Sequence, residues 1–468
     1  MIFSSIPFLY YFLPVVLLLY FLVPKRLKNL VLLLSSLFFY GWGEPKYVVI
    51  MVISIVVGFV LGHLIEVFRG KGLSKVFLIL SVISAICMLG YFKYMDFFIT
   101  NINAVTGLTL PLLKIALPIG ISFYLFQILS YTVDVYRGTV PAQKNIIHFG
   151  AYVSCFPQLI AGPIVRYSDI AEQLSSRTHT FEKTAYGIRR FIMGLSKKVL
   201  LANALGELCD IFRASDDKSV LFYWLYAISF TLHIYFDFSG YSDMAIGLGK
   251  IFGFDFIENF NHPYVSKSIT EFWRRWHISL GSWFRDYVYI PLGGNRVSKG
   301  RWFLNILTVW MLTGFWHGAS WNFIVWGLLY AAFLVLEKLF LGKYLKNSKV
   351  WCHIYVMFIV CFGFVIFNAT NLGEALQYFG AMFGAGSVPF VSTEFTYYLG
   401  SFGFILLLSI VGSTPLPKII IKKLSGIKDG MGERILNIAE PIISVILLLL
   451  VTAYLVDGSF NPFLYFRF

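Results

Sequence analysis

The chain has 468 residues, of which 58% are hydrophobic and 13% are charged, about half the charged share of an average soluble domain. This composition excludes a disordered chain and a fibrous repeat, and it argues strongly against an ordinary soluble globule. A membrane-spanning helix needs about 20 mostly apolar residues. Long apolar runs also argue against an outer-membrane barrel, whose strands alternate in polarity.

The formal net charge of +14 would suggest a nucleic-acid partner in a soluble protein. Here the basic residues fall in short loops between apolar runs, so we expect them to set membrane topology and predict no nucleic-acid partner. The five cysteines show neither a CxxC pair nor a metal-ligand spacing, and we predict no metal site. No cleavage site follows the first apolar run, which we interpret as a retained span.

Four spans are predicted in the N-terminal quarter, over residues 7–23, 29–42, 47–68 and 76–92. The loops after the first and third spans are basic and lie on one side of the membrane; they contain Lys25, Arg26, Lys28, Arg69, Lys71 and Lys75. The positive-inside rule makes that side cytoplasmic and places the N-terminus outside.

A fifth span over residues 113–135 returns the chain to the cytoplasmic side, and many basic residues follow it as far as Lys218. The apolar stretch 146–165 contains Pro157 and Pro163, which predicts a broken, re-entrant segment. Residues 188–202 carry their apolar side chains on one helical face, which predicts a helix lying along the interface.

Residues 220–236 form the next predicted span, and a polar group follows it: Asp237, Ser239, Tyr241 and Asp243. Charges at the end of an apolar run need partners or water, which makes Asp237 and Asp243 candidates for lining a substrate path. Alternatively, Ser239 or Asp243 caps a following helix. Both interpretations stay open at this point.

Further spans are predicted over residues 302–316, 320–339, 350–367, 396–411 and 438–456, with an interfacial helix or loop over 372–383. The chain shows no internal repeat and no soluble domain. We therefore predict an all-α, polytopic integral membrane helix bundle with about 10–11 transmembrane helices plus re-entrant and interfacial helices.

The densest run of polar and aromatic residues is 270–296, TEFWRRWHISLGSWFRDYVYIPLGGNR. A helical wheel over 272–287 gathers one mainly aromatic face: Phe272, Trp273, Trp276, His277, Leu280, Trp283, Phe284 and Tyr287. The opposite face is polar: Arg274, Arg275, Ser279, Ser282, Arg285 and Asp286. This pattern predicts a single amphipathic helix at the cytoplasmic interface.

Two histidines are candidate catalytic residues. His277 lies in the aromatic face, where a lone histidine is more often a packing residue bonded to a carbonyl. His317, in GFWHGASWNFIVWG, follows a run of about 22 Å that is too short to cross a hydrocarbon core of about 30 Å. We expect it inside the membrane profile, where an ionisable residue is a functional candidate. A neutral imidazole can take a proton from a hydroxyl, and nearby N–H groups can hold an acyl oxyanion.

The sequence contains none of the motifs HExxH, GxSxG or GK[ST], and no GxGxxG before a helix. Zinc, α/β-hydrolase and P-loop chemistry therefore lack support. Transport remains open, because intramembrane polar residues can also line a permeation path.

The two histidine segments, FWRRWHISLGSWFRDYVYIPLGGNR and GFWHGASWNFIVWG, resemble those of the membrane-bound O-acyltransferases, most of all the bacterial alginate O-acetyltransferase subfamily. Four segments add to the likeness: PIGISFYLFQILSYTVDVYRG, FPQLIAGPIVR, YFDFSGYSDMAIGLGKIFGF and the terminal NPFLYFRF. The resemblance covers the chain and implies a helix bundle around a central funnel or tunnel. It places the family's invariant histidine at His317 and its second site position at His277.

The resemblance implies a multi-pass protein of the inner (cytoplasmic) membrane that moves an acetyl group from a cytoplasmic thioester for O-acetylation of an exported polysaccharide. Acetyl-CoA or an acyl carrier would be the donor substrate, with no bound cofactor. The implied partners are membrane lipid and either the polysaccharide acceptor or an extracytoplasmic SGNH-type acetyltransferase. D-alanyl transfer to teichoic acid and peptidoglycan O-acetylation are the alternatives within the family, and a transporter or channel is the alternative outside it.

We predict that His317 is the general base and that His277 orients the acyl group or stabilises the oxyanion. The predicted substrate-contacting or tunnel-lining residues are Trp276, Trp316, Asp237, Asp243 and Ser279. The predicted contacts to donor, partner or lipid head groups are Arg274, Arg275 and Arg285. We expect one membrane-embedded domain over residues 1–468, with N-terminal spans in 1–112, a catalytic core in 113–340 and C-terminal spans in 341–468.

Overall fold

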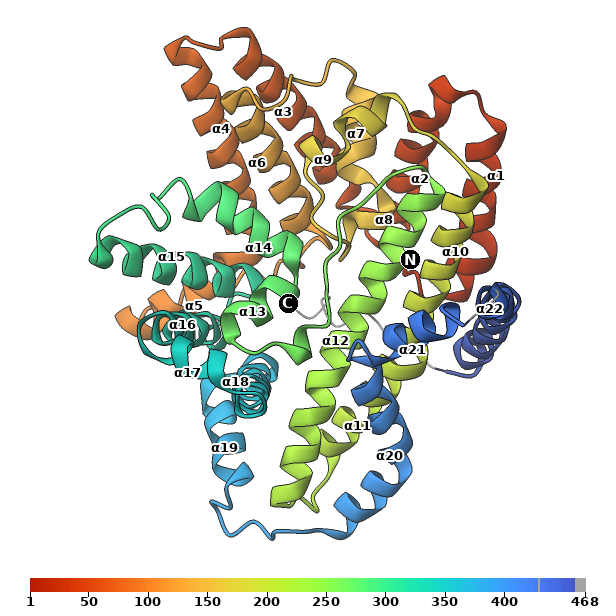
Figure 1. Cartoon of the computed structure of the whole chain (residues 1–468). Coiled ribbons are helices and arrows are strands. Elements are labelled where there is room, and N and C mark those ends of the chain that lie inside the picture. Colours follow the sequence, from red (N-terminus) through yellow and green to blue (C-terminus); the bar gives the residue numbers. More distant parts are fainter. Residues whose placement is uncertain (428–429, 459–468) are drawn as a thin grey trace. The chain divides into compact units, whose positions relative to one another are not determined.

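The computed structural model describes residues 1–427 and 430–458, which form helices and no strand (Figure 1). The predicted all-α, polytopic membrane fold is therefore confirmed. The terminal NPFLYFRF lies outside the described residues.

The chain forms two compact units. The first comprises residues 1–191 and 244–257, and the second comprises 192–243 and the described residues from 258 onward. Helices α10 (Phe181–Ser196) and α12 (Val220–Ile251) each begin in one unit and end in the other. The predicted division into N-terminal, catalytic and C-terminal segments stays a prediction.

The first unit contains the N-terminal helices. Their order is η1 (Pro7–Phe12), α1 (Leu13–Leu22), η2 (Lys25–Leu27), α2 (Lys28–Gly43), α3 (Val48–Val67), α4 (Gly72–Leu89), η3 (Gly90–Tyr94), α5 (Met95–Thr106), α6 (Ile121–Arg137), α7 (Ile146–Ser154), α8 (Phe156–Leu159) and α9 (Tyr167–Ser175). Helices α3, α4 and α6 pack against one another, and α2 packs on α7. The apolar stretch 146–165 is broken after Ser154, as its prolines predict.

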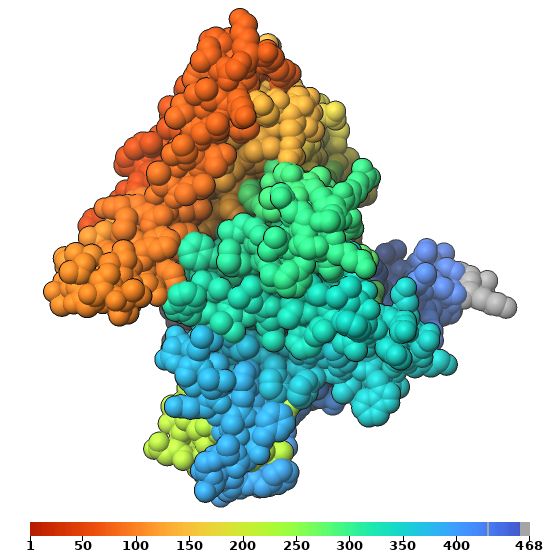
Figure 2. Space-filling view, turned by 90° about the vertical axis from the view of Figure 1, so that its left-hand side faces the viewer, coloured from red at the N-terminus to blue at the C-terminus, as the bar shows by residue number. Residues whose placement is uncertain are grey.

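Helices α3 and α4 form part of the orange surface in Figure 2. Large apolar side chains are exposed along both, including Val49, Ile53, Ile79 and Ile83. Exposed apolar area of this extent is unfavourable in water and favourable in lipid. These two helices therefore present a surface suited to the hydrocarbon core of a bilayer.

The second unit contains the remaining helices, with the candidate site among them. Their order is η4 (Lys197–Ala202), α11 (Asn203–Ala214), η5 (Pro263–Val265), α13 (Ile269–Arg275), α14 (Ile278–Phe284), η6 (Arg285–Tyr289), α15 (Lys299–His317), α16 (Trp321–Leu336), η7 (Glu337–Leu341), α17 (Gly342–Asn347), α18 (Trp351–Asn368), α19 (Leu372–Met382), α20 (Thr393–Gly412), α21 (Leu416–Ser425) and α22 (Met431–Asp457).

Among the described residues, seven helical segments are long and apolar enough to cross a membrane: Val48–Val67, Gly72–Thr106, Val220–Ile251, Trp321–Asn347, Trp351–Asn368, Thr393–Gly412 and Met431–Asp457. A shorter apolar segment covers Pro7–Leu22. The number is below the predicted ten or eleven partly because α2 has only 16 residues and α6 only 17, or about 25 Å of helix.

Helix α12 differs from the other candidate spans in its burial. In its most apolar stretch 78% of the residues are buried, compared with 6% for α22. α12 is therefore a central helix, whereas α22 presents its side chains outward. It also continues unbroken past Asp237 to Ile251, so the interpretation of Ser239 or Asp243 as the cap of a following helix is wrong.

Glycines allow α10 to approach α12 closely. In the second unit a Cβ on Gly240 would lie 2.7 Å from the Gly194 carbonyl oxygen, and in the first unit a Cβ on Gly247 would lie 2.6 Å from that of Gly187. Small residues at helix contacts are the usual device for close packing in membranes. The apolar side chains that share a face in residues 188–202, such as Phe191, Leu195 and Val199, are buried. This segment packs against α12, and its position along the membrane interface stays a prediction.

Helices α15 and α16 form the tightest helix pair of the second unit. A Cβ on Gly314 would overlap the Phe323 carbonyl oxygen, and one on Gly327 would overlap that of Trp310. The chain between the helices is only three residues long, so His317 at the end of α15 is held at a sharp turn.

Replacing Gly327 by alanine is expected to destabilise the protein by about 1–3 kcal/mol, because the added methyl group meets a backbone oxygen that cannot move freely. Thermal unfolding of the purified protein in detergent measures this effect. Gly300→Ala is the matched control, since a Cβ there meets nothing within 4 Å. Equal midpoints for the two variants would contradict the close helix contact.

Candidate functional site

His277 lies at a break between two short helices. α13 ends at Arg275 and α14 begins at Ile278, and His277 between them has a φ of 45°. This left-handed conformation costs a non-glycine residue about 1–3 kcal/mol. The predicted single amphipathic helix over residues 272–287 is therefore wrong. The strained backbone requires strong local contacts to hold it.

The loop between α12 and α13 supplies those contacts. The Ile278 N–H donates to the Asn259 carbonyl oxygen at 3.0 Å, and the Arg275 carbonyl accepts from the Asn261 N–H at 2.9 Å. The Ser279 N–H and hydroxyl donate to Asn259 Oδ1 at 3.2 and 2.9 Å. Unpaired groups at helix ends must find partners, and Asn259 acts as the cap for α14. Ser279, predicted on the polar face, is buried here.

Asn259 also determines which nitrogen of His277 carries the proton. Its Oδ1 lies 3.1 Å from His277 Nδ1. Because the Ser279 backbone N–H can only donate, the Asn259 atom at this point is the oxygen, and Nδ1 must be protonated. Nε2 then carries a lone pair, and it is buried without a hydrogen-bond partner among the described residues. Burial lowers the pKa of His277 to about 3, which keeps the ring neutral.

Trp316 lies between the two predicted catalytic histidines. Its ring centroid is 6.1 Å from that of His277 and 4.9 Å from that of His317. Both histidines are almost fully buried, at 2% and 5% exposure. The second unit therefore brings the two histidines to one indole ring, away from bulk water.

Aromatic rings pack against His317. The centroid of Trp326 lies 5.0 Å away and that of Phe367 lies 5.3 Å away, both edge-on. Trp326 Nε1 is buried and, like Asn259 Nδ2, finds no hydrogen-bond acceptor in the described part of the chain. Leaving such a donor unpaired costs about 1–3 kcal/mol. These two N–H groups are suited to an oxygen atom of a bound ligand.

Trp276 belongs to an aromatic cluster that supports α13. Its ring centroid lies 5.1 Å from Phe260, 5.6 Å from Phe272 and 5.2 Å from Phe364. These contacts give it a packing role, and its role in lining a substrate path stays a prediction.

Glu337 anchors the start of α13. This carboxylate is buried, and it accepts the backbone N–H of Ile269 at 2.5 Å and that of Thr270 at 2.9 Å. A negative charge at the first turn of a helix is electrostatically favourable. Glu337 at its start and the Asn261 N–H at its end thus fix α13, the helix that leads to His277.

The predicted path-lining carboxylates both form ion pairs. Asp237 lies 2.5 Å from Lys198, with only 1% and 3% of their side chains exposed. Asp243 lies 2.6 Å from Lys197 in a more open position. The close approach of α10 to α12 brings these lysines to α12, which gives Asp237 a structural role. Contact of either carboxylate with substrate stays a prediction.

The three predicted donor-contacting arginines lie at the surface. Arg275 pairs with Glu271 at 2.7 Å, and Arg285 pairs with its neighbour Asp286 at 2.7 Å. Arg274 is exposed. Exposed ion pairs of this kind contribute little to stability. Binding of a donor, partner or lipid by these arginines stays a prediction.

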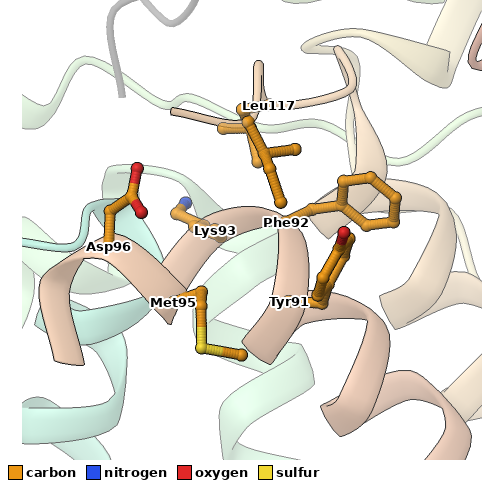
Figure 3. Close-up of a pocket in the computed structure, with 7 residues that line it drawn as sticks. Tyr91, Phe92, Lys93, Met95, Asp96 and Leu117 are labelled. Carbon is orange, nitrogen blue, oxygen red and sulfur yellow. The ribbon is translucent and has the colours of Figure 1, made fainter. Parts of the chain in front are cut away.

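The first unit has a small pocket at the junction of α4 and α5 (Figure 3). It is lined by Tyr91, Phe92, Lys93, Met95, Asp96, Ile115 and Leu117. Asp96 accepts the backbone N–H groups of Leu113 and Lys114 at 2.7 and 2.9 Å, which holds an extended segment against α5. The predicted span 113–135 therefore becomes helical only at Ile121. The pocket contains none of the predicted site residues.

Sequence reasoning missed Asn259 and Trp326. Asn259 lies in the segment IENFNHPY, which mixes polar and aromatic residues, and an amide directly before Phe260 was the available signal. Trp326 is the next-to-last residue of the motif that contains His317, and it lies in the second turn of α16. Neither position could be paired with its histidine without knowledge of the fold.

Comparison with known sequences gives one family match and a series of relatives. The sequence model of the membrane-bound O-acyltransferase family matches residues 140–373. A probable alginate O-acetylase of Azotobacter vinelandii is 44% identical over 392 residues, which cover 82% of this chain and 79% of the relative.

Two relatives with names that indicate other activities have lower identity to this chain. A peptidoglycan O-acetyltransferase of Helicobacter pylori is 34% identical over 425 residues, covering 83% of this chain and 81% of the relative. A teichoic acid D-alanyltransferase of Bacillus subtilis is 30% identical over 271 residues, covering 53% of this chain and 68% of the relative. The matched region contains both histidines and Asn259.

Lys198→Met is expected to destabilise the protein by about 3–5 kcal/mol, because it removes the buried ammonium group that lies 2.5 Å from the Asp237 carboxylate. Unfolding in detergent measures this. Lys197→Met is the matched control at the more exposed pair, with a cost of about 1 kcal/mol or less. The double variant Lys198→Met with Asp237→Leu should recover most of the loss. Equal effects of the two lysine substitutions would contradict the structural role.

Asn259→Ala is expected to allow both neutral tautomers of His277, because Nδ1 loses its hydrogen-bond acceptor. Nitrogen NMR of histidine-labelled protein should show a protonated Nδ1 and a bare Nε2 in the native chain, and a mixture in the variant. Ser279→Ala is the control, since it leaves the Asn259 oxygen in place. A native ring protonated on Nε2 would overturn the assignment.

Proposed function

This chain belongs to the membrane-bound O-acyltransferase family, and we propose that it moves an acetyl group from a cytoplasmic thioester for O-acetylation of an exported polysaccharide. The chain is thus an O-acyltransferase and a multi-pass integral membrane protein. The observation that carries the proposal is the pair of buried histidines joined through Trp316, with unpaired polar atoms beside both.

In the proposed reaction, His317 is the general base. Its imidazole takes the proton of an acceptor hydroxyl, and the oxygen attacks the thioester carbonyl carbon. A tetrahedral intermediate forms, the carbon–sulfur bond breaks, and the sulfur leaves as a thiol with the proton that the imidazolium returns. The step needs no covalent enzyme intermediate and no metal ion. Burial among Trp316, Trp326 and Phe367 supports this role, because exclusion of water protects the thioester from hydrolysis.

His277 suits the orienting role better than the oxyanion role. With Nδ1 bonded to Asn259, the neutral ring offers only a lone pair at Nε2, which can accept a hydrogen bond but cannot stabilise a negative oxygen. The N–H groups of Trp326 and Asn259 are the better oxyanion donors, because both are buried and unpaired among the described residues. We assign the oxyanion contact to one or both of them.

The relatives favour acetylation over the other family activities. The alginate O-acetylase match has higher identity and coverage than the D-alanyltransferase match, and the identity of the peptidoglycan O-acetyltransferase lies between the two. An acetylated polysaccharide is therefore the proposed product, with peptidoglycan acetylation as the second candidate. The family assignment removes the need for the transporter or channel interpretation.

The proposed orientation follows from the basic loops. Lys25, Arg26 and Lys28 after the first apolar helix would lie on the cytoplasmic side of the cytoplasmic membrane and place the N-terminus outside. Acetyl-CoA or an acyl carrier would then reach the protein from inside. The acceptor outside would be the polysaccharide itself or an SGNH-type acetyltransferase that completes the transfer.

His317→Ala is expected to lower the rate of acetyl transfer by about 10²–10⁴-fold, the usual effect of losing a general base. The ester content of the extracellular polysaccharide should fall accordingly. Mild-base release and quantification of acetate from the polymer measures it, with protein level checked in the membrane fraction. His63→Ala is the matched control, because this histidine is exposed on the apolar helix α3. Unchanged acetylation in His317→Ala at normal protein level would refute the enzymatic role.

His277→Ala extends the same assay to the orienting role. A large loss of acetate with normal protein level supports that role, whereas full activity would reduce His277 to a packing residue. A scaffold for a secreted transferase would retain acetylation in both histidine variants.

A further inference from the structure

A cluster of cationic side chains lies in the first unit, separate from both histidines of the site. We call it the Arg177 cluster, and it consists of Lys28, Arg177 and His179 together with the rings of Tyr20 and Phe254. Lys28 Nζ lies 4.6 Å from the Tyr20 ring centroid, and Arg177 Cζ lies 4.4 Å from that of Phe254. His179 Nε2 lies 3.0 Å from the Tyr20 hydroxyl oxygen. Two chain segments, the start of α2 and the loop over residues 176–180, thus place cationic or ionisable groups beside the rings of Tyr20 and Phe254.

The Arg177 cluster has no counter-ion among the described residues. Neither Lys28 nor Arg177 forms an ion pair there, although both are only partly exposed. Arg177 Nη1 is buried and lacks a hydrogen-bond acceptor within the described chain. Partly desolvated positive charges without an anion repel one another and cost free energy. Binding of a negatively charged ligand would lower this free-energy cost.

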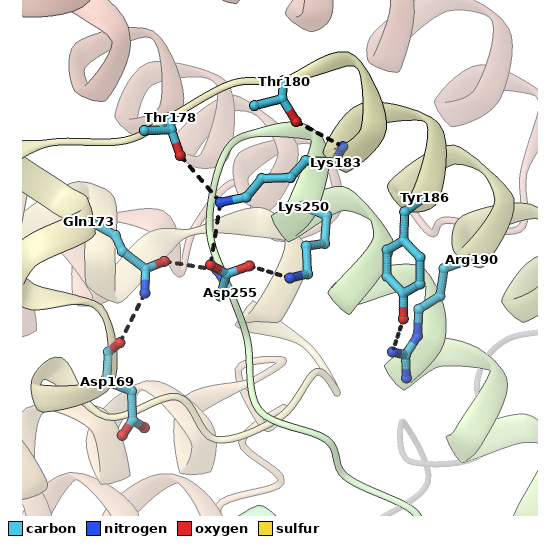
Figure 4. Close-up of polar contacts among 9 residues, drawn as sticks. All are labelled: Asp169, Gln173, Thr178, Thr180, Lys183, Tyr186, Arg190, Lys250 and Asp255. Atoms are coloured by element: carbon cyan, nitrogen blue, oxygen red, sulfur yellow. Dashed lines mark hydrogen bonds and ion pairs between the residues drawn. The ribbon is translucent and has the colours of Figure 1, made fainter.

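Two neighbouring lysines, Lys183 and Lys250, differ from Lys28 and Arg177 because both pair with a carboxylate (Figure 4). Lys183 lies 3.6 Å from Asp255, and Lys250 pairs with the same carboxylate. Burial raises the pKa of Asp255, but the hydrogen bonds and charges of Lys250 and Lys183 outweigh burial and hold it below its usual value. Asp255 thus pairs with two lysines and forms no ion pair with Arg177.

The loop over residues 176–180 sends alternate side chains to opposite sides. Lys183 Nζ donates to Thr178 Oγ1 at 3.3 Å, and Thr180 Oγ1 accepts the Lys183 N–H at 3.2 Å (Figure 4). Arg177 and His179 alternate with these threonines in the chain, and they contact the rings of Phe254 and Tyr20. The loop is therefore fixed from one side and presents its cationic side chains on the other.

Titration behaviour agrees with an uncompensated positive field. Burial lowers the pKa of Lys28, and the charge of Arg177 lowers it further. Burial also lowers the pKa of His179, with added contributions from Lys28 and Arg177. A bound anion would reverse these electrostatic contributions.

We propose that the Arg177 cluster is a binding site for a phosphate group. The planar guanidinium offers paired N–H donors that match phosphate oxygens, Lys28 adds a point charge, and the hydrogen-bonded His179 adds a third polar group. Two sources supply this chemistry: a soluble phosphate ester, such as the nucleotide part of a thioester donor, or the head group of an anionic phospholipid. The site stands on charge and geometry and does not depend on the proposed acyl transfer.

The test uses the full-length protein in nanodiscs or detergent with two probes. Adenosine 3′,5′-bisphosphate binding is measured by calorimetry, and retention of phosphatidylglycerol is measured by native mass spectrometry. Arg177→Gln and Lys28→Gln are each expected to weaken binding of one probe by about tenfold or more, since each removes a charge-assisted hydrogen bond. Arg177→Lys keeps the charge and should retain part of the affinity.

Lys71→Gln is the matched control, because Lys71 is an exposed cation of the same unit outside the cluster. Loss of the nucleotide probe in the cluster variants alone supports a soluble phosphate ester, and loss of the lipid probe alone supports a phospholipid head group. Three outcomes overturn the proposal: native protein that binds neither probe, cluster variants that bind both probes normally, or an equal loss in Lys71→Gln. If Arg177→Gln fails to fold, Lys28→Gln and Arg177→Lys test phosphate binding by the cluster with the same criteria.

Discussion

The side-chain oxygen of Asn259 is the interaction on which the candidate site depends. It accepts hydrogen bonds from the Ser279 N–H, the Ser279 hydroxyl and His277 Nδ1. These bonds cap α14, hold His277 in a left-handed backbone conformation and leave a lone pair on its Nε2. Without this acceptor, the break between α13 and α14 would leave buried N–H groups unpaired, each at a cost of about 1–3 kcal/mol.

The surrounding structure makes such a polar site possible inside an apolar protein. Glycines let α10 approach α12 and α15 approach α16, so that the backbones themselves form the scaffold. Lys198 and Asp237 are both buried, and each compensates the charge of the other. Glu337 fixes the start of α13. The polar atoms that remain unpaired near the histidines are then the ones available to substrate.

The sequence predicts the long apolar helices well, because length and hydropathy alone define them: α3, α18 and α20 lie within three residues of their predicted bounds. It also predicts both histidines as site residues, and the structure places the rings of both beside Trp316. It fails where distant segments decide the outcome. The helical periodicity of 272–287 continues through His277, and only an amide 18 residues earlier explains the break. Likewise, Asp237 looked like part of a helix boundary because its partner Lys198 belongs to another segment.

In the proposed reaction, the thioester carbonyl binds between His317 and His277, beside Trp316. The most direct measurement is a cryo-EM structure of the protein with a stable ketone analogue of acetyl-CoA, in which carbon replaces the thioester sulfur. We expect the carbonyl carbon to lie next to His317 and its oxygen to lie within hydrogen-bond distance of Trp326 Nε1 or Asn259 Nδ2. An analogue bound with its carbonyl away from both histidines would contradict it.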